Sequence, residues 1–162
     1  MQIPKVSIVI PVYNREDLIE ETIKSALNQT YTNFEIVVVD NRSTDKTWKI
    51  IQKLAEKFIE IKAFQNETNI GPVKNWLEGI QLAQGDYIKI LFSDDLLFCD
   101  CVSSMVAQMN DNVAFVSCSP AIGKHPGAAS TRYRFSRFKQ TSSLSSQKFI
   151  TDTLLAFGGL VS

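Results

Sequence analysis

The sequence lacks the features that mark several large classes of protein. No apolar run approaches the roughly 20 residues that cross a bilayer, and the opening stretch MQIPKVSIVIP contains no small-residue cleavage site. Basic and acidic residues number 17 each, so no net charge favours nucleic acid or a lipid surface. We therefore expect a cytoplasmic protein with no nucleic-acid partner and no transmembrane segment, at most peripheral to the inner membrane surface.

Histidine, cysteine and glycine-rich phosphate loops are also scarce. A single histidine, with three cysteines that lack CxxC spacing, excludes the usual zinc site. We expect Cys99, Cys101 and Cys118 to be buried free thiols. Neither GxGxxG after the first strand-like run nor GxxxxGK[ST] occurs, so the two commonest phosphate-cradling loops are missing. A bound phosphate would therefore need a cation to neutralise it.

The sequence does contain a regular alternation of strand-like and helix-like segments. Its 162 residues are 44% hydrophobic, enough to bury one core. Runs of β-branched and aromatic residues predict strands at 5–14, 34–41, 59–66, 86–95 and 112–118. The first two runs are apolar at nearly every position, which is typical of parallel strands covered on both faces.

Apolar residues at helical spacing lie between these runs. The four stripes are Leu18, Ile19, Ile23, Ala26 and Leu27; Trp48, Ile51, Ala55 and Phe58; Val73, Trp76, Leu77 and Ile80; and Val102, Met105, Val106 and Met109. We interpret them as core-facing. The alternation predicts an open, mainly parallel α/β sheet of the Rossmann-like class with helices on both faces.

The chain changes in composition after Cys118. Basic and aromatic residues interleave from Arg132 to Lys139, and alternation over residues 131–138 predicts a strand with one basic face. That face is either ordinary solvated surface or a docking site for an anionic partner. A helix is expected over residues 146–156. We therefore divide the chain into an α/β half, residues 1–118, and a second region, residues 119–162.

Polar residues end three of the predicted strands. Sheets of this class bind ligands beyond the carboxyl ends of their strands, so we expect the polar residues at those ends to share one crevice. They are Tyr13, Asn14, Asp40, Asn41, Ser93, Asp94 and Asp95. The adjacent carboxylates of Asp94 and Asp95 could bind a hard divalent cation. On the pair alone, an exposed acidic turn capping the next helix is an equally good interpretation.

Three motifs together resemble a known family. VSIVIPVYN, FEIVVVDNRSTDKT and NETNIGPVKNWLEGIQLAQGDYIKILFSDD are similar, in order and separation, to the donor half of family 2 glycosyltransferases with the GT-A fold, over residues 5–118. The resemblance implies a hexosyltransferase-type enzyme that transfers a sugar from a nucleoside diphosphate sugar. We expect the donor to be UDP-linked and the transfer to invert the anomeric centre of the sugar. The resemblance also implies Mg²⁺ or Mn²⁺ held by a DxD-type motif, and a glycan, lipid-linked or protein acceptor in cell-surface polysaccharide synthesis.

The resemblance also implies roles for individual residues. Those implied to bind the nucleotide sugar are Pro11, Val12, Tyr13, Asn14, Glu16, Asp40, Asn41, Ser43, Asn69, Gly71, Lys74, Asn75, Ser93 and Asp94. Asp40 would accept a hydrogen bond from the base, Lys74 would contact the base or the phosphates, and Arg15 would lie nearby. Asp95, helped by Asp94, would ligate the cation, which would act as a Lewis acid on the departing nucleotide.

The chain departs from the family pattern at two positions. Asn41 stands where a second aspartate is frequent, and Phe92 stands where many relatives have the first acid of the metal motif. The resemblance implies that the general base is a carboxylate well downstream, in the acceptor half, so we expect it beyond residue 162. Asp152, in the predicted terminal helix, has no motif around it. Residues 119–162 would then begin an acceptor-side region, and the chain would bind nucleotide without completing the transfer.

Other interpretations stay open at this point. Lys74 could be solvated surface, and residues 41–45 could cap a helix with or without a ligand. A phosphatase-like domain could use Asp40 or Asp94 as a nucleophile. The chain could also be a noncatalytic module that binds a nucleotide or a partner.

Overall fold

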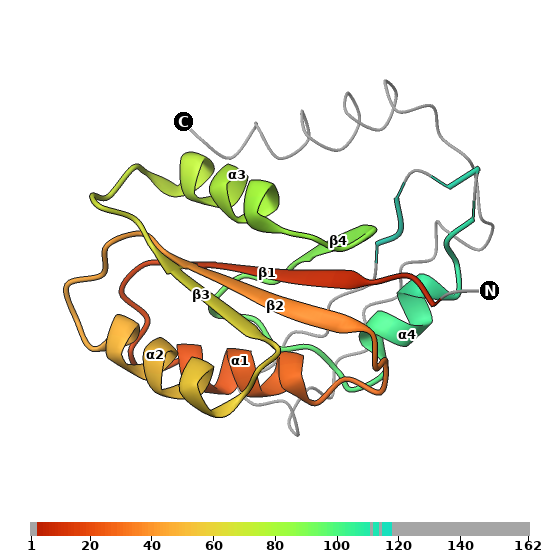
Figure 1. Cartoon of the computed structure of the whole chain (residues 1–162), viewed down its shortest axis with the longest axis horizontal. Coiled ribbons are helices and arrows are strands. Elements are labelled where there is room, and N and C mark those ends of the chain that lie inside the picture. Colours follow the sequence, from red (N-terminus) through yellow and green to blue (C-terminus); the bar gives the residue numbers. More distant parts are fainter. Residues whose placement is uncertain (1–2, 111, 114, 118–162) are drawn as a thin grey trace, which may run out of the picture. The chain divides into compact units, whose positions relative to one another are not determined.

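Strands and helices alternate along the computed structural model, which describes residues 3–110, 112–113 and 115–117. The elements are β1 (Val6–Val12), α1 (Ile19–Leu27), β2 (Phe34–Asp40), α2 (Thr47–Lys57), β3 (Ile61–Gln65), α3 (Pro72–Leu82), β4 (Tyr87–Ile90) and α4 (Cys101–Val106) (Figure 1). A first compact unit ends at Ser104 and a second begins at Met105. The site described below lies within the first unit.

The four strands form one parallel sheet in the order β3-β2-β1-β4. β1 pairs with β2 from Val6 opposite Phe34 to Val12 opposite Asp40. Helices α1 and α2 lie on one face of the sheet and α3 lies on the other (Figure 1). The predicted open α/β sheet with helices on both faces is therefore confirmed.

The core lies along β1 and β2. All seven residues of β1 are buried, and so are all residues of β2 after Phe34. Ile19, Ile23 and Ala26 of α1 face this core as predicted, whereas Leu18 is 42% exposed. The continuous apolar runs thus correctly indicated strands covered on both faces.

Helix α3 turns a different face to the sheet from the one predicted. Val73 and Leu77 of the expected stripe are 60% and 53% exposed, while Asn75 and Gly79 are buried. A Cβ atom on Gly79 would lie 2.5 Å from Cγ1 of Val9, so the helix approaches the sheet too closely for a larger side chain. The core-facing interpretation was therefore wrong for this stripe.

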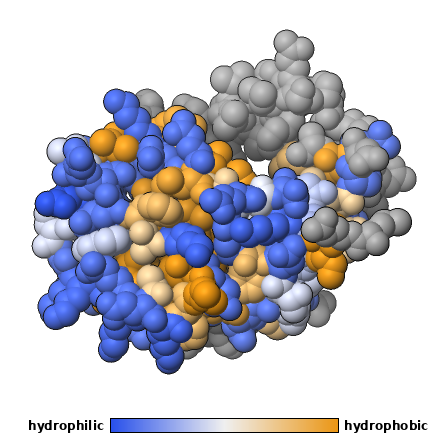
Figure 2. Space-filling model, viewed as in Figure 1, coloured by the Kyte–Doolittle hydropathy of each residue, from blue (hydrophilic) through white to orange (hydrophobic). Residues whose placement is uncertain are grey.

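Part of the apolar surface consequently faces solvent. Trp76 of α3 packs against Phe92, with ring centroids 5.3 Å apart, and both rings remain partly exposed. In Figure 2, hydrophilic residues dominate the left and lower margins of the visible surface, and hydrophobic residues gather nearer its middle. Exposed apolar residues at helical spacing explain why periodicity alone selected the wrong face of α3.

A buried carboxylate braces the amino end of the sheet. Glu35 of β2 is 4% exposed and accepts hydrogen bonds from Nζ of Lys5 (2.6 Å), Oγ of Ser7 (2.7 Å) and the amide of Gln84 (2.8 Å). The amide of Gly85 donates to Ser7 Oγ at 2.8 Å. This network ties the loop before β4 to β1 and β2.

Several predictions on the later part of the chain are corrected or untested. β4 ends at Ile90, not at residue 95. In the predicted fifth strand, residues 112–113 and 115–117 are not in a strand, and Ala114 and Cys118 lie outside the described residues. Cys99 is exposed and Cys101 is half-buried, so burial was wrongly predicted for Cys99.

The boundary at residue 118 stays a prediction. The basic strand over 131–138, the helix over 146–156 and Asp152 all lie outside the described residues. Within the described part of the chain, no helix has the length and apolar character needed to cross a membrane.

Candidate functional site

The sheet opens between β1 and β4 because Pro11 cannot continue their ladder. The amide of Leu91 donates to the carbonyl of Val9, so Val9 turns its polar backbone groups towards β4. Pro11, two residues on, faces the same side and has no N–H to offer. β4 pairs with β1 only as far as Ile90 opposite Val9, while β1 runs on to Val12 beside β2. The loops after β1 and β4 therefore separate where the strand order reverses, which is the usual ligand position in such sheets.

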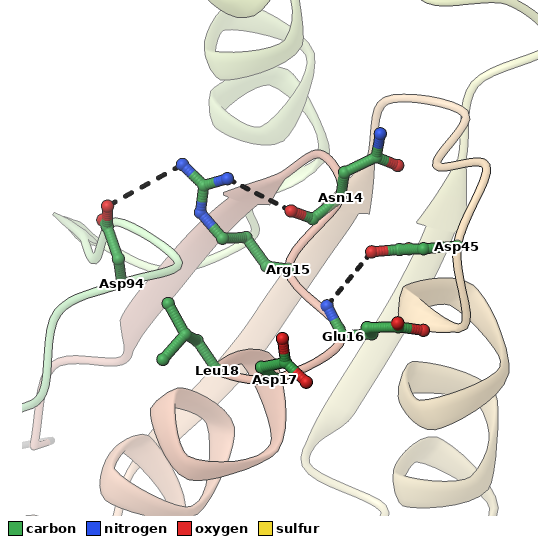
Figure 3. A pocket seen from close by; sticks show the side chains of 7 residues that line it. All are labelled: Asn14, Arg15, Glu16, Asp17, Leu18, Asp45 and Asp94. Atoms are coloured by element: carbon green, nitrogen blue, oxygen red, sulfur yellow. Dashed lines mark hydrogen bonds and ion pairs between the residues drawn. The ribbon is translucent and has the colours of Figure 1, made fainter.

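A pocket of about 480 Å³ lies at this opening (Figure 3). Its lining comes from the loops that follow β1, β2 and β4, so the carboxyl ends of these strands share one site as the parallel sheet predicts. The lining residues are Asn14, Arg15, Glu16, Asp17, Leu18, Asp45 and Asp94.

Asn14 joins the loop after β1 to the loop after β2. It adopts a left-handed conformation with φ of 49°, which asparagine tolerates better than most residues. Its amide donates to Oγ of Ser43 (2.9 Å), and its Oδ1 accepts the amide of Thr44 (2.9 Å). The predicted site residues Asn14 and Ser43 thus hold each other in place.

Glu16 and Asp45 make a reciprocal brace beside Asn14. The amide of Glu16 donates to Asp45 Oδ2 (3.2 Å), and Glu16 Oε2 accepts the amide of Lys46 (2.9 Å). Asp45 Oδ1 accepts the amide of Thr47, the first residue of α2, at 2.9 Å. Burial raises the pKa of Asp45, but the hydrogen bonds from Thr47 and Glu16 lower it to a net value below the ordinary one. Asp45 therefore accepts an amide of the first turn of α2 from the position before the N-cap residue Lys46, whose own side chain makes no capping bond.

Asp40 organises the turn that follows β2. Its carboxylate is fully buried and accepts bonds from the amide (3.1 Å) and hydroxyl of Ser43 and from Nε2 of Gln65 (2.8 Å). Arg42, inside this turn, is left-handed with φ of 63°, at a cost of roughly 1–2 kcal/mol for a residue with a Cβ atom. Asp40 therefore stabilises a strained loop at the site, and its contact with a base stays a prediction.

Four asparagines form a network behind this loop, which we call the asparagine network: Asn41, Asn66, Asn69 and Asn75. Nδ2 of Asn66 donates to Oδ1 of Asn41 (3.0 Å) and of Asn75 (2.8 Å). Nδ2 of Asn41 donates to Oδ1 of Asn69 (2.9 Å), and Nδ2 of Asn75 donates to the carbonyl of Val39 (3.0 Å). Asn41 and Asn75 are 3% and 2% exposed, so they position the loops and α3. None of the four is part of the pocket lining, and the predicted contacts of Asn41, Asn69 and Asn75 with a nucleotide remain predictions.

Gly71 begins α3 from a conformation that favours glycine, with φ of 84°. Its amide donates to Oδ1 of Asn69 at 3.0 Å, and Pro72 follows in the first turn as predicted. Lys74 is exposed on α3 and is outside the pocket lining. The predicted contacts of Gly71 and Lys74 with a nucleotide remain predictions.

The remaining predicted residues divide between the sheet and the surface. Pro11 and Val12 are buried in β1, whereas Tyr13 is 41% exposed at the strand end. Ser93 is buried, and its carbonyl accepts the hydroxyl of Thr22 at 3.1 Å. None of these four side chains is part of the pocket lining.

The two adjacent aspartates occupy a turn after β4. The amide of Asp95 donates to the carbonyl of Phe92 at 3.0 Å, and both carboxylates are exposed. Asp94 lines the pocket, and its Oδ2 lies 3.8 Å from Nη2 of Arg15 (Figure 3). Asp95 is next to the pocket in sequence but is not among its lining residues.

The donor set fits a cation shared with a ligand better than a cation held by protein alone. Within residues 3–110, 112–113 and 115–117, no group of three or more histidine, cysteine or acidic side chains could hold a metal ion. Mg²⁺ usually keeps waters and takes one or two carboxylates together with substrate phosphates. Asp94 and Asp95 could supply those one or two carboxylates. Without a cation, the acids of the pocket lining would repel a diphosphate.

Sequence reasoning missed Asp17, Leu18 and Asp45 as pocket residues. Asp45 belongs to the stretch DNRSTD after β2, which could cap a helix with or without a ligand, and Asp45 itself was given no role in binding. Asp17 and Leu18 come directly before α1, and the spacing of apolar residues in that helix does not indicate a pocket. Their position in the chain directly after a parallel strand was the available signal.

Comparisons with known proteins agree with this geometry. A profile described as Glycosyl transferase family 2 matches residues 7–158. The chain is 32% identical over 148 residues to the GalNAc(5)-diNAcBac-PP-undecaprenol beta-1,3-glucosyltransferase of Campylobacter jejuni, covering 91% of this chain and 48% of that protein. The chain spans less than half the length of such relatives.

Two solved structures are similar in fold. The first is S. aureus TarS 1-349 in complex with UDP-GlcNAc, with a TM-score of 0.59 and 35% identity over 64% of this chain and 30% of that one. The second is the mannosyltransferase PcManGT from Pyrobaculum calidifontis in complex with GDP-Man and Mn2+, with a TM-score of 0.54 and 29% identity, covering 57% and 28% of the two chains. The GT-A fold expected from the sequence is confirmed.

Proposed function

The chain belongs to glycosyl transferase family 2, and from this we propose that it forms the donor-binding half of an enzyme that transfers a sugar from a nucleoside diphosphate sugar. The observation that carries the proposal is the pocket at the opening between β1 and β4, which residues from the loops after three parallel strands line together. The UDP-GlcNAc and GDP-Man complexes of the two similar structures support a sugar nucleotide as donor. We propose a UDP-linked sugar, with transfer that inverts the anomeric carbon.

The residues of the pocket would bind and orient the donor. Asn14, Glu16 and Asp45 fix the loops after β1 and β2 through the hydrogen bonds between them. The buried Asp40 keeps the turn beside them ordered, so little of the site needs to rearrange on binding. Preordered loops lower the entropy cost of holding a flexible diphosphate.

A divalent cation would be held by Asp95 and Asp94. When bound, such an ion supplies Lewis-acid stabilisation of negative charge on the departing diphosphate. The acidic lining supports this proposal, since Glu16, Asp17 and Asp45 would disfavour a bare diphosphate near Asp94. The Mn2+ in the mannosyltransferase structure supports it as well.

The acceptor and the general base would lie on the acceptor side of the protein. We propose a lipid-linked or polymeric glycan acceptor, because the similar C. jejuni protein is named for an undecaprenol-linked substrate. Residues 1–118 would bind the donor, and residues 119–162 would begin the acceptor-side region.

Titration calorimetry with UDP, with and without Mn²⁺, tests the proposal. We expect Mn²⁺ to tighten UDP binding at least about tenfold, since a bridging cation contributes more than about 1.4 kcal/mol. Asp95→Ala should remove this gain. Asp100→Ala, at an exposed aspartate farther along the same loop, is the matched control and should keep it. Equal affinity for UDP with and without the metal would contradict metal-dependent donor binding.

A further inference from the structure

Arg15 is the basic side chain of an otherwise acidic pocket. The other charged residues of the pocket lining, in the described part of the chain, are the acids Glu16, Asp17, Asp45 and Asp94. In Figure 3 the guanidinium points towards Asp94. A diphosphate entering this pocket would meet one cation of the protein and several carboxylates. The position of the Arg15 guanidinium is therefore decisive for any anionic ligand.

The backbone of Arg15 is fixed at the start of α1. Its amide donates to Oγ1 of Thr47 at 2.8 Å, and its carbonyl accepts the amides of Leu18 (3.0 Å) and Ile19 (2.9 Å). These bonds hold the residue between α1 and the first turn of α2. The backbone of Arg15 is thus held in place at the pocket.

The guanidinium itself is held loosely. Nη1 donates to the carbonyl of Asn14 at 3.1 Å, and Nη2 lies 3.8 Å from Oδ2 of Asp94. The two charged side chains are 42% and 54% exposed, and ion pairs this open to solvent contribute little stability. A ligand that binds the guanidinium more strongly than Asp94 does can therefore replace Asp94 at a small cost in free energy.

We propose that Arg15 receives the diphosphate of the donor, and that its ion pair with Asp94 is a resting contact which the arriving diphosphate breaks. The inference rests on the proposed function. A guanidinium binds two phosphate oxygens through parallel N–H groups, which is a better match than one carboxylate oxygen at 3.8 Å. The exchange also frees the Asp94 carboxylate for its role in donor binding.

The exchange gives Asp94 opposite effects in two conditions. Without a divalent cation, Asp94 competes with the diphosphate for Arg15 and so weakens its binding. With the cation present, the same carboxylate supports binding. General repulsion by a nearby negative charge would also weaken metal-free binding, so the test must separate repulsion from competition for Arg15.

A double-mutant cycle makes this separation. UDP affinity is measured by calorimetry in EDTA for the wild-type chain, Asp94→Asn, Arg15→Gln and the double variant. We expect Asp94→Asn to tighten binding about threefold, the range of an exposed ion pair, and Arg15→Gln to weaken it about tenfold. In the double variant the gain from Asp94→Asn should vanish. Asp17→Asn, which removes the same charge from a pocket residue not paired with Arg15 in the structure, should tighten binding less than Asp94→Asn.

The outcomes that overturn the inference are distinct from those that overturn the proposed function. If the gain from Asp94→Asn persists in the Arg15→Gln background, the effect is simple repulsion and the inference fails. Wild-type affinity for UDP in Arg15→Gln also overturns it, while leaving donor binding intact. If the wild-type chain binds UDP neither in EDTA nor with Mn²⁺, both fall. Uridine, which carries no phosphate, should bind all four proteins alike, and a loss with Arg15→Gln there would point to the base or ribose instead.

Discussion

Asn75→Ala is expected to lower the free energy of unfolding by about 1–3 kcal/mol, because a buried side chain loses both of its hydrogen bonds, although Asn66 keeps its bond to Asn41. Nδ2 of Asn75 donates to the carbonyl of Val39, and its Oδ1 accepts Nδ2 of Asn66. The side chain is 2% exposed, so water does not readily replace either bond. The loss should be larger than that from an ordinary surface substitution on the same helix.

Urea denaturation followed by circular dichroism measures this change. Gln81→Ala is the matched control, because Gln81 is exposed on α3 and alanine favours the helix slightly. Its free energy of unfolding should stay within about 0.5 kcal/mol of the wild type. A cost below about 1 kcal/mol for Asn75→Ala would mean that the asparagine network does not hold α3 to the sheet.

Glu35→Gln is expected to lower the free energy of unfolding by about 1.5–3 kcal/mol at neutral pH, because a charged acceptor is lost from a buried brace. Glutamine can still accept from Ser7 and from the amide of Gln84. It cannot pair with Lys5, whose Nζ lies 2.6 Å from Glu35 Oε2. Lys5 is partly exposed and can be solvated, so the cost stays below that of a fully buried broken pair.

The difference between wild type and Glu35→Gln should depend on pH. Burial raises the pKa of Glu35, but hydrogen bonds from Lys5, Ser7 and the Gln84 amide, with the charge of Lys5, bring it below the ordinary value of 4.5. A lowered folded-state pKa contributes stability that is fully present above the unfolded value and is lost as the pH falls through the folded value. Unfolding curves at pH 7 and at successive steps below pH 4.5 should therefore converge as acid is added. A difference that is constant across this range would show that the charge of Glu35 contributes nothing.

The sequence was most informative about the central strands and about where their ends meet. The continuous apolar runs VSIVIPV and FEIVVVD indicated strands buried on both faces, and β1 and β2 are such strands. Parallel strands end at one edge, so Asn14 and Asp94 could be placed at a common site before any contact was known. The pocket contains both.

Other features depend on contacts that no local pattern reports. The asparagine network joins Asn41 to residues 25 and 28 positions away in the chain, and amide side chains carry no periodic signal. The buried face of α3 was predicted from apolar spacing, but close approach at Gly79 excludes large side chains there. The ion pair between Arg15 and Asp94 likewise joins the loops after β1 and β4. These loops are neighbours because β4 lies beside β1 in the sheet, which no local sequence pattern reports.

The most direct test of the account is to locate nucleotide binding on the chain itself. Backbone amide resonances of the ¹⁵N-labelled protein would be followed while UDP is added in the presence of Mg²⁺. We predict that the largest shifts fall on the loops after β1, β2 and β4, at residues 13–17, 41–45 and 93–95, and that the amino end of the sheet around Glu35 and Gln84 stays unchanged. Shifts concentrated at that amino end, or none at saturating UDP, would contradict a donor site at the opening between β1 and β4.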